Sequence, residues 1–281
     1  MIKIEFDNVV KSLAGKVDSP RLEGRIIMGY VLKKDDNEII PKTYTLTIEQ
    51  HKQLESIIKQ RSQGCPLDKI IGEKDFYKYR FKVSQDVLSP RPDTETLVEA
   101  AGKLIFKNNL KKVLDLGTGS GCILLSLLAD FPSLFGVGVD ISNKALTIAK
   151  ENAQRLGVEQ RCYFKELSWD DEKFADKLGE EFDMIVSNPP YIPREDIKGL
   201  DTGVKDYDPF GALDGGEDGY DHYRLIAKKV PQILSKEGYL LLECGINQAE
   251  DVKNIFEKQG LNWQETLRDL GGVERCIILK K

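Results

Sequence analysis

A four-residue segment, Asn188-Pro189-Pro190-Tyr191, combines groups that could bind and activate a planar nitrogen. The two prolines fix the backbone and remove two N–H donors, which leaves main-chain carbonyls free to accept. The side-chain oxygen of Asn188 and the main-chain oxygen of Pro189 could each accept a hydrogen bond from one NH₂ group, and the Tyr191 ring could cover its face. Such acceptors favour the charge that develops on an amide or amino nitrogen during attack. A purely structural proline turn would not explain the Asn and Tyr.

A second segment, residues 117–121, reads Gly-Thr-Gly-Ser-Gly and follows a short apolar run. Glycines before a helix let main-chain N–H groups approach a ligand closely. The dinucleotide fingerprint would need a glycine at position 122, where the chain has Cys122. Asp140 ends the next apolar run, where a carboxylate can bind ribose hydroxyls. Although a tight turn without ligand is the alternative, the combination predicts a nucleoside site that does not take nicotinamide or flavin dinucleotides.

The cysteines and histidines form no recognisable catalytic or metal-binding pattern. The five cysteines include no CxxC pair, and His51 and His222 are the only histidines. An odd number of dispersed cysteines is typical of reduced thiols inside a cell. We therefore expect no metal site and no catalysis by a Cys or Ser nucleophile.

The elements that would position the two segments alternate between strands and helices. Apolar runs predict strands at 113–116, 135–139, 162–165, 184–187 and 239–243, and amphipathic patterns predict helices near 121–130, 143–156, 221–234 and 247–259. Two more strand-like runs, 263–267 and 276–279, are too close in sequence for a crossover helix and must be antiparallel. The predicted fold class is α/β, with a seven-strand, doubly wound, mostly parallel sheet that ends in an antiparallel hairpin.

The N-terminal part predicts a small helical domain. Ser19-Pro20 places a proline at the first position of one helix, and Thr47 with Gln50 forms a capping-box pattern before a second. Aromatic and β-branched residues at 75–88 predict a hairpin, and a helical pattern resumes from Asp93. We predict a helical domain at 1–74, a hairpin connector at 75–90 and the α/β domain at 91–281.

Composition excludes several classes of protein. The chain has 281 residues, 41% of them hydrophobic, with 41 Lys and Arg against 46 Asp and Glu and a net charge of −5. It can bury a core, which excludes disordered, collagen-like and coiled-coil proteins. The negative charge argues against non-specific nucleic-acid binding. The longest apolar stretch, 122–129, is too short to span a bilayer, and the first residues lack the apolar run of a signal peptide, so we expect a cytoplasmic location without a membrane partner.

Both segments resemble those of S-adenosylmethionine-dependent methyltransferases that act on a planar nitrogen. More closely, the chain resembles the release factor glutamine methyltransferases from about residue 64 to its end. The motifs that carry the resemblance, in order, are Pro66-Leu67-x-x-Ile70-Ile71-Gly72-Glu73-x-x-Phe76, Pro90-Arg91-Pro92-Asp93-Thr94-Glu95, Asp115-x-Gly117-Thr118-Gly119-Ser120-Gly121, Asn188-Pro189-Pro190-Tyr191, Ala212-Leu213-Asp214-Gly215-Gly216-x-Asp218-Gly219, Glu243-x-Gly245-x-x-Gln248 and Asp269-x-x-Gly272-x-x-Arg275.

The resemblance implies methyl transfer from S-adenosylmethionine to the side-chain amide nitrogen of the glutamine in the Gly-Gly-Gln motif of peptide chain release factors. It implies a substrate-recognition role for 1–74 and a methyltransferase domain at 91–281. The cofactor-binding residues it implies are Gly117, Thr118, Gly119, Ser120, Gly121, Asp140, Trp169 and Asn188. The implied catalytic residues are Asn188, Pro189 and Tyr191, and the implied substrate-binding residues are Asn188, Pro189, Pro190 and Tyr191. Relatives have an Asp-Trp pair near adenine, whereas here Ser168 precedes Trp169.

Two other functions remain open at this stage. An adenine-N6 methyltransferase acting on DNA or RNA could use the same Asn-Pro-Pro-Tyr motif, but it predicts a basic target-binding region. The N-terminal part instead mixes Lys33 and Lys34 with Asp35, Asp36 and Glu38. A non-catalytic S-adenosylmethionine-binding protein would not need both motifs. We expect a monomer whose partner is a release factor, without direct contact to nucleic acid.

Overall fold

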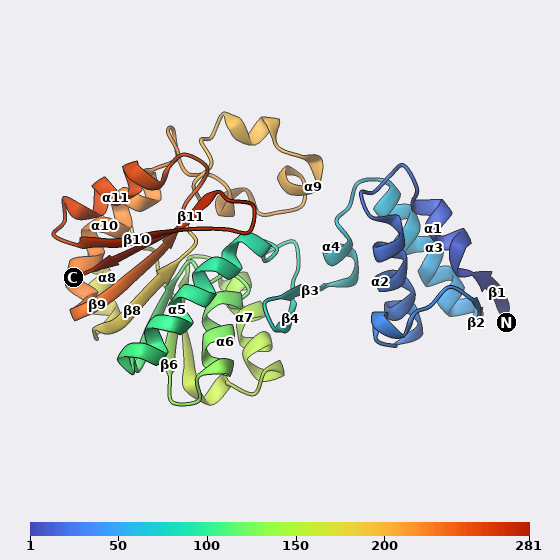
Figure 1. The fold of residues 1–281 in the computed structure, drawn as a ribbon, viewed down its shortest axis with the longest axis horizontal. Helices are drawn as coiled ribbons and strands as arrows, with labels where there is room; N and C mark the ends of the chain where they lie inside the picture. Colours follow the sequence, from blue (N-terminus) through green and yellow to red (C-terminus); the bar gives the residue numbers. More distant parts are fainter. The chain divides into compact units, whose positions relative to one another are not determined.

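A computed structural model describes all residues from 1 to 281. The chain forms two compact units, drawn in chain order from blue to red in Figure 1. The smaller unit comprises Met1–Gly72 and Thr202–Tyr207, and the larger unit comprises Glu73–Asp201 and Asp208–Lys281. The larger unit therefore contains both predicted ligand-binding segments.

The smaller unit packs helices around one buried apolar cluster. Its elements are β1 (Ile2–Glu5), α1 (Phe6–Leu13), α2 (Pro20–Leu32), β2 (Thr43–Leu46), α3 (Ile48–Ser62), α4 (Leu67–Ile71) and α9 (Thr202–Lys205). The capping box is present, because the Thr47 hydroxyl accepts from the Gln50 N–H at 3.1 Å and the Gln50 side chain accepts from the Thr47 N–H at 3.0 Å. The antiparallel pair β1–β2 was not predicted, since four-residue strands give too little alternation to detect.

The larger unit is built on the predicted seven-strand sheet. Its strands are β5 (Lys112–Leu116), β6 (Phe135–Asp140), β7 (Cys162–Glu166), β8 (Phe182–Ser187), β9 (Leu234–Glu243), β10 (Asn262–Arg268) and β11 (Glu274–Lys280). Their order across the sheet is β10-β11-β9-β8-β5-β6-β7, and only the pairs that involve β11 are antiparallel. The predicted fold class is confirmed.

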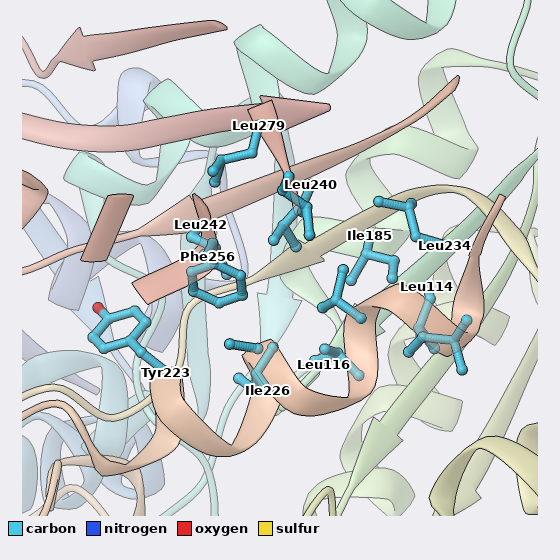
Figure 2. Close-up of a cluster of buried hydrophobic side chains, with 14 of the residues drawn as sticks. Leu114, Leu116, Ile185, Tyr223, Ile226, Leu234, Leu240, Leu242, Phe256 and Leu279 are labelled. Atoms are coloured by element: carbon cyan, nitrogen blue, oxygen red, sulfur yellow. The ribbon is translucent and has the colours of Figure 1, made fainter. Parts of the chain in front are cut away.

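Helices cover both faces of this sheet. They are α5 (Glu95–Asn108), α6 (Cys122–Asp130), α7 (Asn143–Arg155), α8 (Phe174–Leu178), α10 (Asp221–Ile233) and α11 (Ala249–Glu257). Alternate residues of β5 point to opposite faces, so Leu114 packs in the cluster with α10 and α11, whereas Val113 packs in the cluster with α5 and α6. Figure 2 shows the first cluster, in which Tyr223, Ile226 and Phe256 meet the sheet.

Several boundaries differ from the predicted ones. The hairpin is shorter than 75–88 and consists of β3 (Glu73–Phe76) and β4 (Tyr79–Lys82). A 3₁₀ turn, Pro92–Thr94, precedes α5, so the α-helix begins at Glu95, two residues after the predicted start at Asp93. Strand β9 begins five residues earlier than predicted, at Leu234, because the polar residues 235–238 hide its start. The five cysteines are free thiols, and no helix has the length and apolar character needed to span a membrane.

Candidate active site

The strand order brings the two predicted segments together. Strand β5 lies between β6 and β8, and Leu116 at its carboxyl end pairs with Val139 on one side and Ser187 on the other. The residues that follow these strand ends, Gly117 and Asn188, therefore start from the same edge of the sheet. After β5, the chain adds β6 and then β7 on one side of β5, and it then returns to add β8 on the opposite side. Open α/β sheets bind ligands at the point where the strand order reverses in this way.

A cavity of about 410 Å³ lies at this edge. Six of the predicted site residues line it, namely Gly117, Gly119, Asp140, Trp169, Asn188 and Pro190. The other five do not line it, namely Thr118, Ser120, Gly121, Pro189 and Tyr191. The structure thus joins the glycine segment, the acid after the second strand and the Asn-Pro-Pro-Tyr segment around one space.

The glycine turn has a backbone that side chains would disturb. Gly117, Gly119 and Gly121 have φ angles of 73°, 55° and 81°, which L-amino acids rarely adopt. A Cβ atom on Gly117 would also lie 3.3 Å from the Trp169 ring. The Thr118 hydroxyl points away from the cavity and donates to the buried Asp115 carboxylate at 2.7 Å. Thr118 therefore stabilises the turn rather than contacting the cavity.

Asp140 connects the turn to the cavity wall. Its two carboxylate oxygens accept from the main-chain N–H groups of Gly119 and Ser142, each at 2.9 Å. Burial, which is the largest effect, raises the pKa of Asp140, and these N–H donors act in the opposite direction. The carboxylate holds the turn in place while it still borders the cavity.

Trp169 is fixed by a histidine that the sequence prediction did not include. The indole N–H donates to Nδ1 of His222 at 3.2 Å, and Nε2 of His222 lies 3.0 Å from the main-chain oxygen of Asp214. Because a carbonyl oxygen can only accept and the indole N–H can only donate, these two contacts fit the tautomer with its proton on Nε2. His222 also lines the cavity, as does Ser168, whose hydroxyl accepts from the Asp170 N–H at 3.2 Å.

The Asn-Pro-Pro-Tyr segment is anchored at both ends. The Asn188 NH₂ group donates to the Thr94 hydroxyl at 3.2 Å. The Tyr191 hydroxyl donates to the Glu243 carboxylate at 3.2 Å, so this end of the tyrosine faces the sheet rather than the cavity. Pro189 is buried between them.

Glu243 is a fully buried acid at the carboxyl end of β9, beside the end of β8. Burial, the largest effect, raises its pKa to about 7, whereas hydrogen bonding by Thr94 and Tyr191 and the charge of Arg275 lower it. Arg275 itself pairs with Asp93 and Asp269, each at 3.2 Å. One oxygen of Glu243, Oε2, has no hydrogen-bond partner.

A glycine-rich loop packs closely around the tyrosine. The Ile192 N–H donates to the Leu213 carbonyl at 3.1 Å, and the Gly215 N–H donates back to the Ile192 carbonyl at 2.8 Å. A Cβ atom on Gly215 would lie 2.7 Å from the main-chain carbonyl carbon of Tyr191. A Cβ atom on Gly219 would lie 2.6 Å from the main-chain carbonyl oxygen of Tyr191. Larger residues at these two positions would displace the backbone of the segment that carries Asn188.

Thr94, Glu243 and His222 were therefore missed as site residues. Thr94 and Glu243 stood within motifs that the sequence analysis quoted, but nothing in the sequence paired them with Asn188 and Tyr191. His222 gave only the weak signal of a lone histidine near the start of a helix. No group of three or more His, Cys, Asp or Glu side chains could hold a metal ion.

Comparison with known proteins decides the family. A family model described as "Methyltransferase domain" matches residues 107–270, and one described as "PrmC N-terminal domain" matches residues 7–72. The chain is 42% identical to a protein of Rhodospirillum rubrum named release factor glutamine methyltransferase, over 94% of this chain and 80% of the relative. The chain belongs to this family.

Relatives with the same name occur in other bacteria. The protein from Bradyrhizobium diazoefficiens is 36% identical over 98% of this chain and 95% of the relative. The protein from Bacillus cereus is 36% identical over 91% of this chain and 90% of the relative. The similarity to the Bradyrhizobium diazoefficiens protein extends over both units, because it covers 98% of this chain.

S-adenosylmethionine is the methyl donor of this enzyme. When bound, it supplies a methyl group on a positively charged sulfur. The residues at the cavity fit such a group, because Gly117 and Gly119 present backbone without side chains, Asp140 presents a carboxylate and Trp169 presents an aromatic ring. The cavity also extends to Asn188, the first residue of the Asn-Pro-Pro-Tyr segment.

Proposed function

We propose that the enzyme methylates the side-chain amide nitrogen of the glutamine in the Gly-Gly-Gln motif of peptide chain release factors. The observation that carries this proposal is that Asn188 lines the same cavity as the glycine turn and Asp140. A nitrogen bound by Asn188 would thus lie next to the methyl donor. The names of the relatives and the match to the PrmC N-terminal domain support the same substrate.

In this proposal, Asn188 and Pro189 orient the glutamine amide. An amide nitrogen is a poor nucleophile, because its lone pair is delocalised into the carbonyl. The side-chain oxygen of Asn188 and the main-chain oxygen of Pro189 accept the two amide hydrogens and stabilise the positive charge that develops on nitrogen. Pro190 stiffens the segment, and the Tyr191 ring packs against the amide while its hydroxyl remains on Glu243. The nitrogen forms its bond to the methyl group as the bond between that methyl group and sulfur breaks, and the methylated nitrogen then releases one proton to water, so no strong base is needed.

The cofactor is held by the residues of the other strand ends. Gly117, Gly119 and the main chain of the turn bind its methionine part, Asp140 accepts from the ribose hydroxyls, and Trp169 packs near adenine. Thr118, Ser120 and Gly121 act by fixing the turn, since they do not line the cavity. Ser168 provides no carboxylate for the adenine amino group.

The remaining proposals concern the whole chain. Residues 1–74 recognise the release factor, 75–90 connect, and 91–281 form the catalytic domain. We propose a cytoplasmic monomer that does not bind nucleic acid directly, in keeping with a net charge of −5. Light scattering on the purified enzyme tests the monomer, and a gel-shift assay with oligonucleotides tests nucleic-acid binding.

The central experiment is single-turnover methylation of an intact release factor with labelled S-adenosylmethionine. The Asn188→Ala enzyme should be slower by roughly 10²–10³, because it lacks an acceptor that acts in the transition state. Asn254→Ala, at an exposed position of α11, is the control and should be unaffected. Replacing the target glutamine by asparagine should also abolish transfer, because the shorter side chain withdraws the amide.

Two outcomes would favour the other functions. Methylation of an adenine-containing oligonucleotide, without methylation of the release factor, would identify an adenine-N6 methyltransferase. Binding of S-adenosylhomocysteine without transfer to either substrate would indicate a non-catalytic protein. Near-normal turnover by Asn188→Ala would show that other groups activate the amide.

A further inference from the structure

The Asn188 amide can serve as an acceptor only in one of its two orientations. Its oxygen and its NH₂ group exchange places when the amide turns over, and only the oxygen can receive a hydrogen from a substrate NH₂ group. In the wrong orientation, two donors would face each other. Something must therefore hold the NH₂ group away from the substrate.

Thr94 provides the contact that distinguishes the two orientations. Its hydroxyl lies 3.2 Å from Nδ2 of Asn188, and the residue is only 2% exposed. The position of Thr94 is itself fixed by the 3₁₀ turn Pro92–Thr94, in which its N–H donates to the Arg91 carbonyl at 3.1 Å. A buried and fixed hydroxyl can select one orientation of a neighbouring amide.

The Thr94 hydroxyl acts as a hydrogen-bond acceptor toward Asn188. A threonine hydroxyl has one proton to donate and lone pairs with which to accept. Hydrogen bonding by Thr94 acts to lower the pKa of Glu243, as a donor to a carboxylate does. In the structure, the Thr94 oxygen accepts from the Asn188 NH₂ group at 3.2 Å, which leaves the Asn188 oxygen free to accept from the substrate.

We propose that Thr94 is a positioning residue that holds the Asn188 amide with its oxygen turned toward the substrate nitrogen. This inference rests on the proposed function, since it assigns a cause to the acceptor role of Asn188. At the other end of the motif, the Tyr191 hydroxyl donates to the buried Glu243 carboxylate.

The test uses Thr94→Val, which removes the hydroxyl and keeps the branched shape. Thr94 makes no side-chain capping hydrogen bond to α5, so the helix keeps its start. We expect kcat for release factor methylation to fall on the order of tenfold, the effect of one lost hydrogen bond, with an unchanged Kd for S-adenosylhomocysteine. Thr94→Ser should restore most of kcat. Ser126→Ala, which removes a buried hydroxyl without a partner in α6, should change nothing.

A double-mutant cycle separates positioning from a general packing effect. In the Asn188→Ala background, Thr94→Val should cause no further loss, because the group that it positions is gone. An equal loss in both backgrounds would overturn the proposal. If Thr94→Val unfolds early in a thermal melt, Thr94→Ala replaces it in the same cycle.

A spectroscopic readout keeps this inference separate from the proposed function. The side-chain amide signal of Asn188, assigned by its absence from Asn188→Ala, should shift in Thr94→Val and return toward its place in Thr94→Ser. An unshifted signal would refute the positioning role whatever the activity. A wild-type enzyme that leaves release factors unmethylated, but whose Asn188 signal responds to Thr94, would refute the proposed function and retain the contact.

Discussion

At the scale of single residues, Asp140 has two tasks, and one substitution removes both. Its carboxylate accepts from Gly119 and Ser142 and also borders the cavity. Asp140→Ala should weaken S-adenosylhomocysteine binding by about 1–3 kcal/mol, the scale of hydrogen bonds to a charged group. Isothermal titration calorimetry measures this change, with Asp176→Ala on the exposed side of α8 as control. An unchanged affinity would exclude Asp140 as the ribose acceptor.

His222 holds Trp169 by accepting a hydrogen bond from the indole N–H, so replacing His222 should weaken cofactor binding. His222→Phe keeps an aromatic ring but leaves that N–H without its acceptor. We expect an affinity for S-adenosylhomocysteine about fivefold lower, equivalent to about 1 kcal/mol. His51→Phe in the smaller unit serves as the matched control. Equal affinities for the two variants would mean that Trp169 is held well enough by packing alone.

At the scale of elements, the fit of α6 against β6 depends on a glycine. A Cβ atom on Gly136 would lie 2.5 Å from Leu124, which is fully buried and cannot move aside without displacing its neighbours. Gly136→Ala should therefore lower the free energy of unfolding by about 1–3 kcal/mol, despite the smaller entropy of the unfolded chain. Urea denaturation measures it. Gly199→Ala, where a Cβ meets nothing within 4 Å, should be nearly neutral.

At the scale of the whole molecule, buried acids make stability depend on pH. Burial raises the pKa of Glu243 from its ordinary 4.5 to about 7, so between these values the folded protein binds more protons than the unfolded chain. The free energy of unfolding must then fall as pH rises through this window, by about 3 kcal/mol for one such group. Asp115, whose pKa is likewise raised to about 7 by burial, acts in the same direction.

Replacing the acid tests this assignment. Glu243→Gln keeps an oxygen that can accept from Tyr191 and removes the ionisation. The loss of stability between pH 4.5 and 7 should be smaller in this variant than in the wild type, in chemical denaturation at several pH values. Glu257→Gln, at an exposed position, should leave the wild-type profile intact. Parallel profiles for wild type and Glu243→Gln would show that Glu243 is ionised throughout.

The sheet, its hairpin end and the local segments can be predicted from the sequence alone. A strand followed by glycines or by Asn-Pro-Pro-Tyr is a feature of neighbouring residues, and the short connection from 268 to 275 excludes a crossover helix. These features can be recognised without knowledge of the fold, because they depend on periodicity and on backbone restrictions. The strand pair β1–β2 was not predicted, because its four-residue strands are too short to show a period of hydrophobicity.

Which side chains contact one another follows from the folded chain and not from the local sequence. Thr94 and Asn188 are 94 positions apart, Tyr191 and Glu243 are 52 apart, and Trp169 and His222 are 53 apart. The contact between Tyr191 and Glu243 depends on the order of the strands, which sets β9 beside β8, and on the register, which brings the ends of those strands level. Side-chain partners across a sheet edge are fixed by packing of the whole unit, and no local pattern in the chain encodes that choice.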